Sequence, residues 1–465
     1  MPRLLLFATT TGYQTRAFGD AAARLGVDLV FATDRCDMLE DPWQDEAIPI
    51  RFHDEARSVA AVLESARARP VAGVLVVGDR PTVIAARVAE VLGLPGHPPA
   101  AAAIARNKQL SRERFRDSGL LVPWFVTLPA EADPTVLAAS ASFPCVVKPL
   151  ALSGSRGVIR ADDPSTFFTA FDRLRAVLRA PEVRAERNDA HDTVLIEGFI
   201  EGREFALEGL LHHGALHVLA LFDKPDPLDG PYFEETIYAT PSSAPELVQQ
   251  AIVDAVGRAA TAIGLRHGPI HAECRVNDRG VFVLEVAARP IGGLCARALR
   301  FEHGVGSLFQ KLPPAHADSH EPEQARGRER ARLGVGPQAP SNRRENDSRP
   351  LEELLMRHAL GEAPDGWSRE SSASGVMMIP IPRRGIFRGV TGLDEARRVV
   401  GIEDVRITAK PDQLLVPLPE GASYLGFIFA RGERRADVEH ALRASQGLLH
   451  FTIDPELPVL QSPHG

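Results

Sequence analysis

The first 96 residues alternate short apolar runs with longer amphipathic stretches, and this alternation constrains the fold more strongly than any other feature of the sequence. The apolar runs predict strands, and the amphipathic stretches predict helices. Strands that alternate with helices at this spacing form a parallel sheet with helices on its faces. No G-x-G-x-x-G follows the first strand, so the segment carries no dinucleotide-binding fingerprint. We expect strands at 4–8, 29–32 and 71–77 and helices at 15–25, 56–67 and 82–92.

From about residue 97 to residue 300 the pattern changes to a mixed α+β arrangement. Several strands there carry charged residues at alternate positions, which places the charges on one face of a sheet. A chain of 465 residues is also too long for a single core, so several domains are expected. We expect helices at 99–106, 108–118, 165–178 and 245–263, and strands at 145–148, 193–197, 204–211, 269–276 and 281–286.

Residues 311–350 differ in composition from everything around them. They contain six prolines, eight basic and six acidic residues, and almost no large apolar side chain. This composition predicts a disordered insertion or linker, and a basic docking segment is disfavoured because the charges nearly cancel. A small strand-rich unit follows. We expect helices at 351–360 and 437–444, and strands at 375–381, 385–390, 405–407, 414–417, 424–430 and 448–453.

The composition disfavours several broad classes of protein. A net charge of −8 argues against nucleic acid as the main partner, because a phosphate backbone requires basic surface. The four cysteines occur singly, so neither a zinc knuckle nor a disulfide framework is indicated, and buried thiols in a reduced compartment are expected. The apolar run at 4–8 is too short for a signal peptide, and no run is long enough to cross a membrane. We therefore expect a cytoplasmic protein.

Two lysines and a glycine-rich loop form the first group of residues that point to a chemistry. Lys108 begins a predicted helix, and Lys148 ends a buried strand, where its ammonium must face an anion or water. The loop S-G-S-R-G-V at 153–158 follows five residues later, and its glycines allow consecutive backbone N–H groups to face an anion. Each lysine alone fits a surface position, and the loop alone fits a hairpin turn. Their spacing, however, favours a phosphate-binding site.

A predicted hairpin supplies two carboxylates. The turn N-D-R-G at 277–280 joins the strands on either side of it and sets Glu273 and Glu285 on adjacent antiparallel strands. Two carboxylates on one face repel each other unless a cation lies between them, and oxygen ligands suit Mg²⁺ that bridges nucleotide phosphates. Arg289 can reach the same anion with two nitrogens. The alternative is a solvated charged hairpin, although the apolar neighbours of Glu285 predict burial.

The segment 194–205, V-L-I-E-G-F-I-E-G-R-E-F, lies between these groups. Its apolar start predicts a buried strand, and the glycine-punctuated stretch that follows fits a slot in which backbone groups read an adenine base. Glu204 is then a candidate to hold a ribose. A β-hairpin with a charged tip explains the same residues equally well.

In this order and spacing, these pieces resemble the ATP-grasp superfamily over roughly residues 1–310. The C-terminal stretches 375–387 and 417–432 resemble the accessory domain of the L-amino-acid ligase branch, which contains dipeptide synthetases. The resemblance implies a multidomain α/β and α+β fold. Its parts would be a Rossmann-like pre-ATP-grasp domain at 1–97, a two-subdomain ATP-grasp domain at 98–310, the insertion or linker at 311–350 and a small β-rich C-terminal accessory domain at 351–465.

The resemblance also implies roles for single residues. Lys108 and Lys148 would contact the phosphates of ATP under the 153–158 loop, and backbone groups from Glu197 onward would read the adenine. Arg289 and Lys148 would act on the transferred phosphoryl group. The residues implied to bind the nucleotide are Lys108, Lys148, Ser153, Gly154, Ser155, Gly157, Val158, Glu197, Phe199, Ile200 and Glu204.

Metal binding would fall to Glu273 and Glu285, with Mg²⁺ as the expected ion and Mn²⁺ as an alternative. Many members of the superfamily have an asparagine two residues after the second glutamate as a further ligand. Ala287 occupies that position here, which leaves the number of metal ions open. Members of the amino-acid-ligase branch often share this departure.

Substrate residues are less clearly marked. A polar, Gly/Pro-rich loop at 223–235 lies in the region that the superfamily uses for substrates, although an ordinary surface loop has the same composition. Within it, Glu234 or Glu235 would hold an ammonium group and Lys224 a carboxylate. The remaining candidates share a strand face with Glu273 or leave room for close backbone approach; they are His271, Arg275, Gly292 and Gly293.

The activity that the resemblance implies is an ATP-dependent ligation of a carboxylate to an amine through an acyl phosphate, with an amino acid as a substrate. Two lysines, an arginine and Mg²⁺ would neutralise the charge of the transferred phosphoryl group. A biotin-carboxylase-like enzyme and a nucleotide-binding protein without catalysis are the alternatives. The expected partners are small carboxylates and amines, with no nucleic acid and no membrane, and a homodimer stays open.

Overall fold

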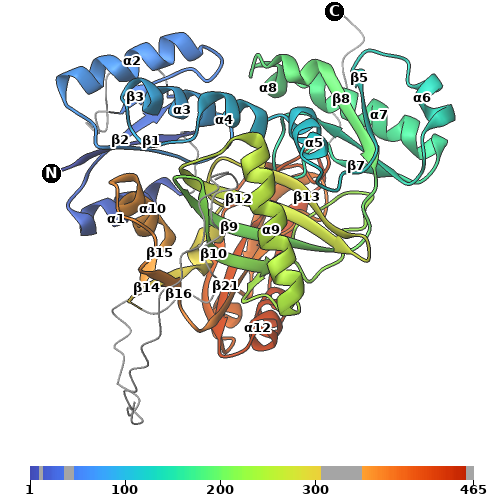
Figure 1. The fold of residues 1–465 in the computed structure, drawn as a ribbon. Helices are drawn as coiled ribbons and strands as arrows, with labels where there is room; N and C mark the ends of the chain where they lie inside the picture. The colour runs from blue at the N-terminus through green and yellow to red at the C-terminus, as the bar shows by residue number, and fades with distance from the viewer. Residues whose placement is uncertain (10–13, 36–46, 305–347, 457–465) are drawn as a thin grey trace, which may run out of the picture.

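The computed structural model describes residues 1–9, 14–35, 47–304 and 348–456. A long central sheet lies between an N-terminal sheet and a smaller antiparallel sheet, and C-terminal strands extend it downward in Figure 1. The segment 311–350 falls almost entirely outside the described residues, so its disorder remains a prediction. Within the described ranges, no helix combines the length and the apolar character needed to cross a bilayer.

The N-terminal part forms the helix-covered parallel sheet that the strand–helix alternation predicts. Its elements are β1 (Arg3–Ala8), α1 (Thr15–Leu25), β2 (Asp28–Thr33), β3 (Ile48–Pro49), α2 (Glu55–Ala68), β4 (Gly73–Val76) and α3 (Thr82–Val91). The strand order is β3-β2-β1-β4, and every pair is parallel. All residues of β1 are buried, because a strand covered on both faces has no solvent-facing side. The carboxyl ends of these strands therefore meet at one edge.

The second part contains a small antiparallel sheet of order β5-β8-β6-β7. Its elements, with the helices around it, are α4 (Pro99–Ala105), α5 (Lys108–Asp117), β5 (Phe125–Pro129), α6 (Thr135–Ser140), β6 (Cys145–Pro149), β7 (Ile159–Ala161), α7 (Pro164–Arg179), α8 (Pro181–Arg184) and β8 (Thr193–Gly198). The side chain of Asn107 caps α5 by accepting hydrogen bonds from the N–H groups of Gln109 and Leu110. This cap fixes the place at which Lys108 enters the helix.

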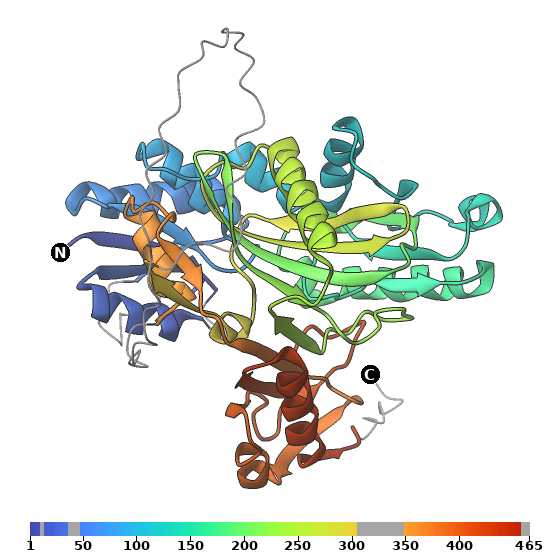
Figure 2. The same cartoon turned by 60° about the horizontal axis from the view of Figure 1, so that its bottom comes forward.

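The central sheet begins with the hairpin that the N-D-R-G turn predicts, and Asn277 is paired with Gly280 as expected. The elements here are β9 (Arg203–His212), β10 (Ala215–Asp223), β11 (Ile237–Thr240), α9 (Glu246–Ile263), β12 (Gly268–Asn277) and β13 (Gly280–Ala287). Helix α9 covers one face of these strands (Figures 1 and 2). Its buried residues are mostly small or aliphatic, as helix-on-sheet packing requires. On the other face, Ala206 and Leu210 of β9 belong to a hydrophobic core that also contains residues of β1.

The C-terminal strands continue the central sheet, whose full order is β13-β12-β9-β10-β11-β17-β21-β19. The elements are β14 (Arg300–His303), β15 (Arg349–Pro350), α10 (Leu351–Ala359), β16 (Trp367–Arg369), β17 (Ala373–Ile379), β18 (Gly385–Thr391), α11 (Leu393–Arg397), β19 (Ile402–Ile407), β20 (Leu414–Leu415), β21 (Gly426–Gly432), α12 (Arg435–Gly447) and β22 (His450–Asp454). Figure 2 shows the strands from β17 onward, with α12, as a lobe at the lower end of the molecule, whereas β14, β15 and β16 form a separate small sheet.

Helix α10 lies apart from this C-terminal lobe. It packs against α1 and β4 beside the N-terminal sheet, as Figure 1 shows, although we expected it to open the C-terminal unit. The hydrophobic core that contains Leu354 joins residues from the N-terminal sheet, the central sheet and the C-terminal strands. The chain is thus held together across the limits expected for its domains, and those limits remain a prediction.

Replacing Leu354 with alanine tests the packing of α10 against α1 and β4. Leu354 is 1% exposed, so Leu354→Ala should lower the free energy of unfolding by about 2–5 kcal/mol through lost burial and a new cavity. Urea unfolding followed by circular dichroism measures this loss. Leu247→Ala on α9 is the matched control, since Leu247 is 86% exposed and its loss should cost less than about 0.5 kcal/mol. Equal costs for the two variants would contradict the packing of α10.

Candidate active site

A cavity of about 640 Å³ lies where the N-terminal sheet, the small sheet and the central sheet meet, and residues 422–424 from the C-terminal part also line it. Lys148 and Glu285, 137 positions apart in the numbering, both line it. Gly157, Lys224 and Glu234 are not among its lining residues, whereas the other residues proposed from the sequence are. Those residues are Lys108, Lys148, Ser153, Gly154, Ser155, Val158, Glu197, Phe199, Ile200, Glu204, His271, Glu273, Arg275, Glu285, Arg289, Gly292 and Gly293.

Lys148 is held at the cavity by a buried ion pair. Strands β6 and β8 are neighbours, and the Lys148 ammonium donates a hydrogen bond to the carboxylate of Glu197. Burial lowers the pKa of Lys148 to about 8, although Glu197 favours the charged form. An anion in the cavity would be a second negative partner and would stabilise the ammonium further. Lys148 is therefore positioned so that a bound phosphate would stabilise its charged form.

Arg112 holds this ion pair from the side of α5, and we did not predict it. Its buried guanidinium donates to Glu197 Oε2 at 2.9 Å and to the backbone oxygen of Leu284 at 2.8 Å, so it joins α5, β8 and β13. Burial favours a protonated Glu197, but Arg112 and Lys148 outweigh it and lower the pKa of Glu197 to about 2. The sequence could have indicated Arg112, because it lies one helical turn after Lys108 and therefore on the same face of the predicted helix.

The glycine-rich loop is shaped as a phosphate-facing turn would require. Gly154, Ser155 and Gly157 have φ angles of 64°, 54° and 74°, in the left-handed region that glycine tolerates best. Lys108 lies beside the loop, and its ammonium donates to the backbone oxygen of Leu152 at 2.8 Å. The N–H of Gly157 donates to the oxygen of Pro419 at 2.8 Å, so that residue anchors the loop to the C-terminal part and does not line the cavity.

Two backbone groups of the segment after β8 are already hydrogen-bonded within the protein. The N–H of Phe199 already donates to the oxygen of Pro144 at 3.0 Å, and the oxygen of Ile200 accepts from Arg275 at 2.7 Å. The contact of an adenine with the other backbone groups of 197–200 remains a prediction. The Phe199 ring instead stacks at 6.2 Å on Phe233 and lines the cavity, where an aromatic face suits a planar ligand.

Glu204 lies between two cations. Its Oε1 accepts from Lys224 and its Oε2 from Arg275, both at 2.8 Å. A carboxylate has about four acceptor sites, so each oxygen keeps room for a hydroxyl donor such as that of a ribose.

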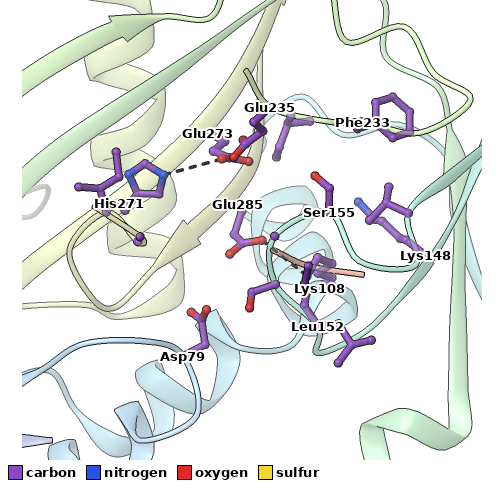
Figure 3. A pocket seen from close by; sticks show the side chains of 18 of the residues that line it. Asp79, Lys108, Lys148, Leu152, Ser155, Phe233, Glu235, His271, Glu273 and Glu285 are labelled. Carbon is purple, nitrogen blue, oxygen red and sulfur yellow. Dashed lines mark hydrogen bonds and ion pairs between the residues drawn. The ribbon is translucent and has the colours of Figure 1, made fainter. Parts of the chain in front are cut away.

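Glu273 and Glu285 are paired directly across β12 and β13, as the hairpin predicts. Their surroundings differ, as Figure 3 shows, because Glu285 points toward Lys108 and Glu273 points toward Glu235. The Glu285 carboxylate is 3.6 Å from the Lys108 ammonium. Lys224 donates to Glu273 at 3.0 Å. The two carboxylates therefore share a strand pair but have separate cationic partners.

Lys224 lies within a group of three carboxylates. Glu204, Glu235 and Glu273 have oxygens within 4.8 Å of one another, and the buried Lys224 ammonium donates to all three. The expectation that Lys224 faces a substrate carboxylate is corrected, because its ammonium is already enclosed by these groups. Burial lowers its pKa, but the three carboxylates outweigh burial and raise it well above the usual value. Half-buried Glu234 lies outside the cavity lining.

Glu235 is the carboxylate of this group whose charge is least favoured. Burial raises the pKa of Glu235 to about 7, and the nearby charge of Glu273 adds to that shift against the opposing effect of Lys224. The hydroxyl of Tyr238 donates to Glu235 at 2.8 Å. A carboxyl group with a pKa near 7 can accept or donate a proton at neutral pH.

His271 lines the cavity as a cation. Its Nδ1 lies 3.1 Å from the fully buried Glu208, and its Nε2 lies 3.7 Å from Glu273. Burial opposes the charge, but both carboxylates outweigh it and raise the pKa of His271 to about 9. Glu208 also accepts the N–H of Ile291 at 3.1 Å, which ties His271 to the chain that follows β13.

Arg289 is already paired with Asp79, which we did not predict. Its Nε and Nη2 donate to the two Asp79 oxygens at 2.9 and 3.0 Å. Burial raises the pKa of Asp79, but Arg289 outweighs it and the pKa is lowered overall. The sequence could have indicated Asp79, because this residue follows the carboxyl end of β4, and functional side chains of parallel sheets lie at that end of the strands. To act on a phosphoryl group, the Arg289 guanidinium would have to contact both Asp79 and the phosphoryl oxygens.

Comparisons with known proteins agree with this geometry. Three family profiles match: the ATP-grasp N-terminal domain over residues 19–96, the ATP-grasp domain over 141–298, and the L-amino acid ligase C-terminal domain 2 over 377–454. An L-amino acid ligase from Bacillus licheniformis has a similar structure, with a TM-score of 0.75 and 25% identity, over 98% of this chain and 99% of that one.

Two curated relatives show how far the sequence similarity extends. The uncharacterized protein y4rH of Sinorhizobium fredii is 21% identical over 98% of this chain and 84% of its own length. The alanine–anticapsin ligase of Bacillus subtilis is 27% identical over 44% of this chain, and the match spans only 46% of that relative. Fold and site together define an ATP-dependent ligase that forms carbon–nitrogen bonds. The chain belongs to the ATP-grasp superfamily, and it is similar to the L-amino acid ligases.

Removing the Lys148 ammonium should weaken ATP binding. A charge-assisted hydrogen bond contributes about 1.5–3 kcal/mol, so Lys148→Ala should raise the dissociation constant for ATP roughly 10- to 100-fold. Calorimetric titration with ATP measures this change. Lys410→Ala removes an exposed lysine elsewhere and serves as the control with unchanged affinity. Equal affinities of Lys148→Ala and the control would remove Lys148 from the phosphate site.

Proposed function

We propose that this chain activates a carboxylic acid with ATP and joins it to an amine, with an amino acid as one substrate. The observation that supports this most strongly is the layout of the cavity. Lys108, Lys148 and the turn at 153–155 lie on one side, and Glu235 and Glu273 lie on another (Figure 3). A triphosphate needs the first group, and an ammonium-bearing substrate needs the second.

In the first step, a carboxylate oxygen of the acid attacks the γ-phosphorus of ATP, and the bond to the ADP oxygen breaks. The product is an acyl phosphate, whose leaving group is phosphate instead of hydroxide. Lys108 and Lys148 offset the negative charge of the transferred group, and the 153–155 turn can direct backbone N–H groups to it. Arg289 lies in the same cavity and can add a third cation by sharing its contact with Asp79.

Mg²⁺ fits the carboxylates at this site. Glu285 is partly exposed to the cavity, and Glu273 lies directly opposite it on the neighbouring strand. Their oxygens are the donors that Mg²⁺ prefers, and the ion would screen the phosphate charges when bound. Ala287 is 2% exposed and has no side-chain donor, so it cannot add the third protein ligand that many relatives have. When Mg²⁺ is bound, its remaining ligands would have to come from phosphate oxygens and water.

In the second step, the amine nitrogen attacks the acyl carbon, the bond to the phosphate oxygen breaks, and the nitrogen loses a proton. Glu235 is the group that we propose takes this proton, because its pKa of about 7 suits proton transfer at neutral pH. A closed, water-poor cavity would limit hydrolysis of the acyl phosphate.

The alternative functions differ in the substrates that they consume. Biotin carboxylase of Campylobacter jejuni shares the fold at a TM-score of 0.58, but at 13% identity this likeness concerns the fold alone. A bicarbonate-using enzyme would not need an amino acid, and a protein without catalysis would bind ATP without releasing ADP. A homodimer and a cytoplasmic location remain parts of the proposal.

A matrix of amino acids and amines separates these alternatives. We expect ADP release only when both an amino acid and an amine are present, with one ADP per amide formed. Coupled detection of ADP, with mass spectrometry of the product, measures both quantities. Release driven by bicarbonate alone would favour the carboxylase, and the absence of release with every pair would favour the inactive protein.

The pH dependence of turnover tests Glu235. Its raised pKa means that the carboxylate is protonated below about pH 7 and able to accept a proton above it, so kcat should rise through pH 7. Glu235→Gln should lower kcat roughly 10²- to 10⁴-fold and abolish that rise. Hydroxylamine, a nucleophile that is neutral at pH 7, should restore product formation in the variant. A wild-type pH profile in Glu235→Gln would contradict the role.

A further inference from the structure

A second group of titratable side chains lies away from the cavity, at the end of the central sheet that faces α10. His212 ends β9, His213 follows it in the turn to β10, and His267 immediately precedes β12. Because β9 and β12 are antiparallel neighbours, with Leu211 paired to Gly268, these histidines meet at one end of the strand pair. None of them lines the cavity described above. His267 is roughly 13 Å along β12 from His271.

The rings of these histidines converge. One ring nitrogen from each of His212, His213 and His267 lies within 4.8 Å of the others. Their ring centroids are separated by 4.5 Å for the first two, 5.3 Å for the first and third, and 4.9 Å for the second and third. On α10, His358 lies beside them, with its Nε2 3.2 Å from His212 Nδ1. Four imidazoles from three segments of the chain therefore share one small volume.

His267 shows that this group is incomplete by itself. The side chain is 7% exposed, yet within the described part of the chain neither ring nitrogen has a hydrogen-bond partner. A buried polar atom without a partner costs about 1–3 kcal/mol, so an absent ligand or water is the usual reason for one. Imidazole binds metal ions through an unprotonated ring nitrogen, and neither nitrogen of His267 is engaged by another described residue.

We propose that His212, His213 and His267 bind one divalent transition-metal ion of the Zn²⁺ type. Neutral imidazole nitrogens select such ions over Mg²⁺, which prefers oxygen. Bonds of about 2.0–2.1 Å in a tetrahedral site bring ligand nitrogens to about 3.3 Å, so a modest contraction is needed. His213 is exposed and lies in a two-residue turn, and it can supply that movement and an entry path.

The fourth position of this site would be open to water. The His267 and His358 rings are stacked at 4.3 Å with an angle of 16° between them, an arrangement in which one ring flanks the other and does not face the same ion. A bound ion would connect the β9–β10 turn to the start of β12, next to the seat of α10. It would therefore stabilise this end of the β9 and β12 strand pair against unfolding.

Zinc titration of the chelator-treated full chain, without nucleotide, tests the proposal. Competition with a chromophoric chelator gives the Zn²⁺ dissociation constant, and Co²⁺ reports tetrahedral ligation through its visible absorption. We expect one tight site per chain. His213→Ala and His267→Ala should each raise the dissociation constant by at least about 100-fold, since even the loss of an outer-shell partner costs 10- to 100-fold. Zn²⁺ should also raise the Tm of the wild type but not that of these variants.

His440→Ala is the matched control, because His440 is exposed on α12, and it should bind Zn²⁺ as the wild type does. His213→Ala decides the outcome even if the buried variant fails to fold. Zn²⁺ held by carboxylates of the large cavity would be bound equally by His213→Ala and the wild type, and that result would overturn the proposal. The proposal would also fall if the wild type binds no tight Zn²⁺, in which case waters satisfy His267.

Discussion

The buried contact that joins Arg112, Glu197 and Lys148 is the interaction on which the large cavity depends. It connects α5, β8 and β6, and Arg112 also reaches the backbone of β13. Removing Glu197 would leave both buried cations without this carboxylate, and breaking a buried ion pair in this way typically costs about 3–5 kcal/mol. The ammonium of Lys148 is thus fixed at the end of a strand instead of moving with a loop. This rigidity sets the position that a phosphate would occupy.

The opposite side of the cavity is organised by a lysine as well. The Lys224 ammonium donates hydrogen bonds to Glu204, Glu235 and Glu273. Its positive charge offsets part of their negative charge, which allows the three carboxylates to lie close together. The cavity therefore has one side lined by Lys108, Lys148 and the glycine-rich turn, and another side lined by carboxylates. Such a division suits a reaction that brings an anionic nucleotide and an ammonium-bearing substrate together.

Local sequence patterns predicted much of the fold. They could not predict which strands and side chains pair when these lie far apart in the sequence. The alternation in the first 96 residues predicts the parallel sheet, α1 has the expected bounds, and the turn at 277–280 sets Glu273 opposite Glu285. In contrast, the pairing of β11 with β17, which joins the C-terminal strands to the central sheet, leaves no periodic signal. The partners of charged residues were missed for the same reason. Asp79 meets Arg289 across 210 positions.

The fate of a carboxylate oxygen tests the central claim most directly. The best amino acid from the substrate matrix, labelled with ¹⁸O in its carboxylate, is turned over with ATP and an amine, and the released phosphate is analysed by mass spectrometry. An acyl phosphate requires that one labelled oxygen pass from the acid to the phosphate, so singly labelled phosphate is expected for each amide formed. Unlabelled phosphate alongside amide formation would show that the acid is not activated by phosphoryl transfer, and would contradict the account.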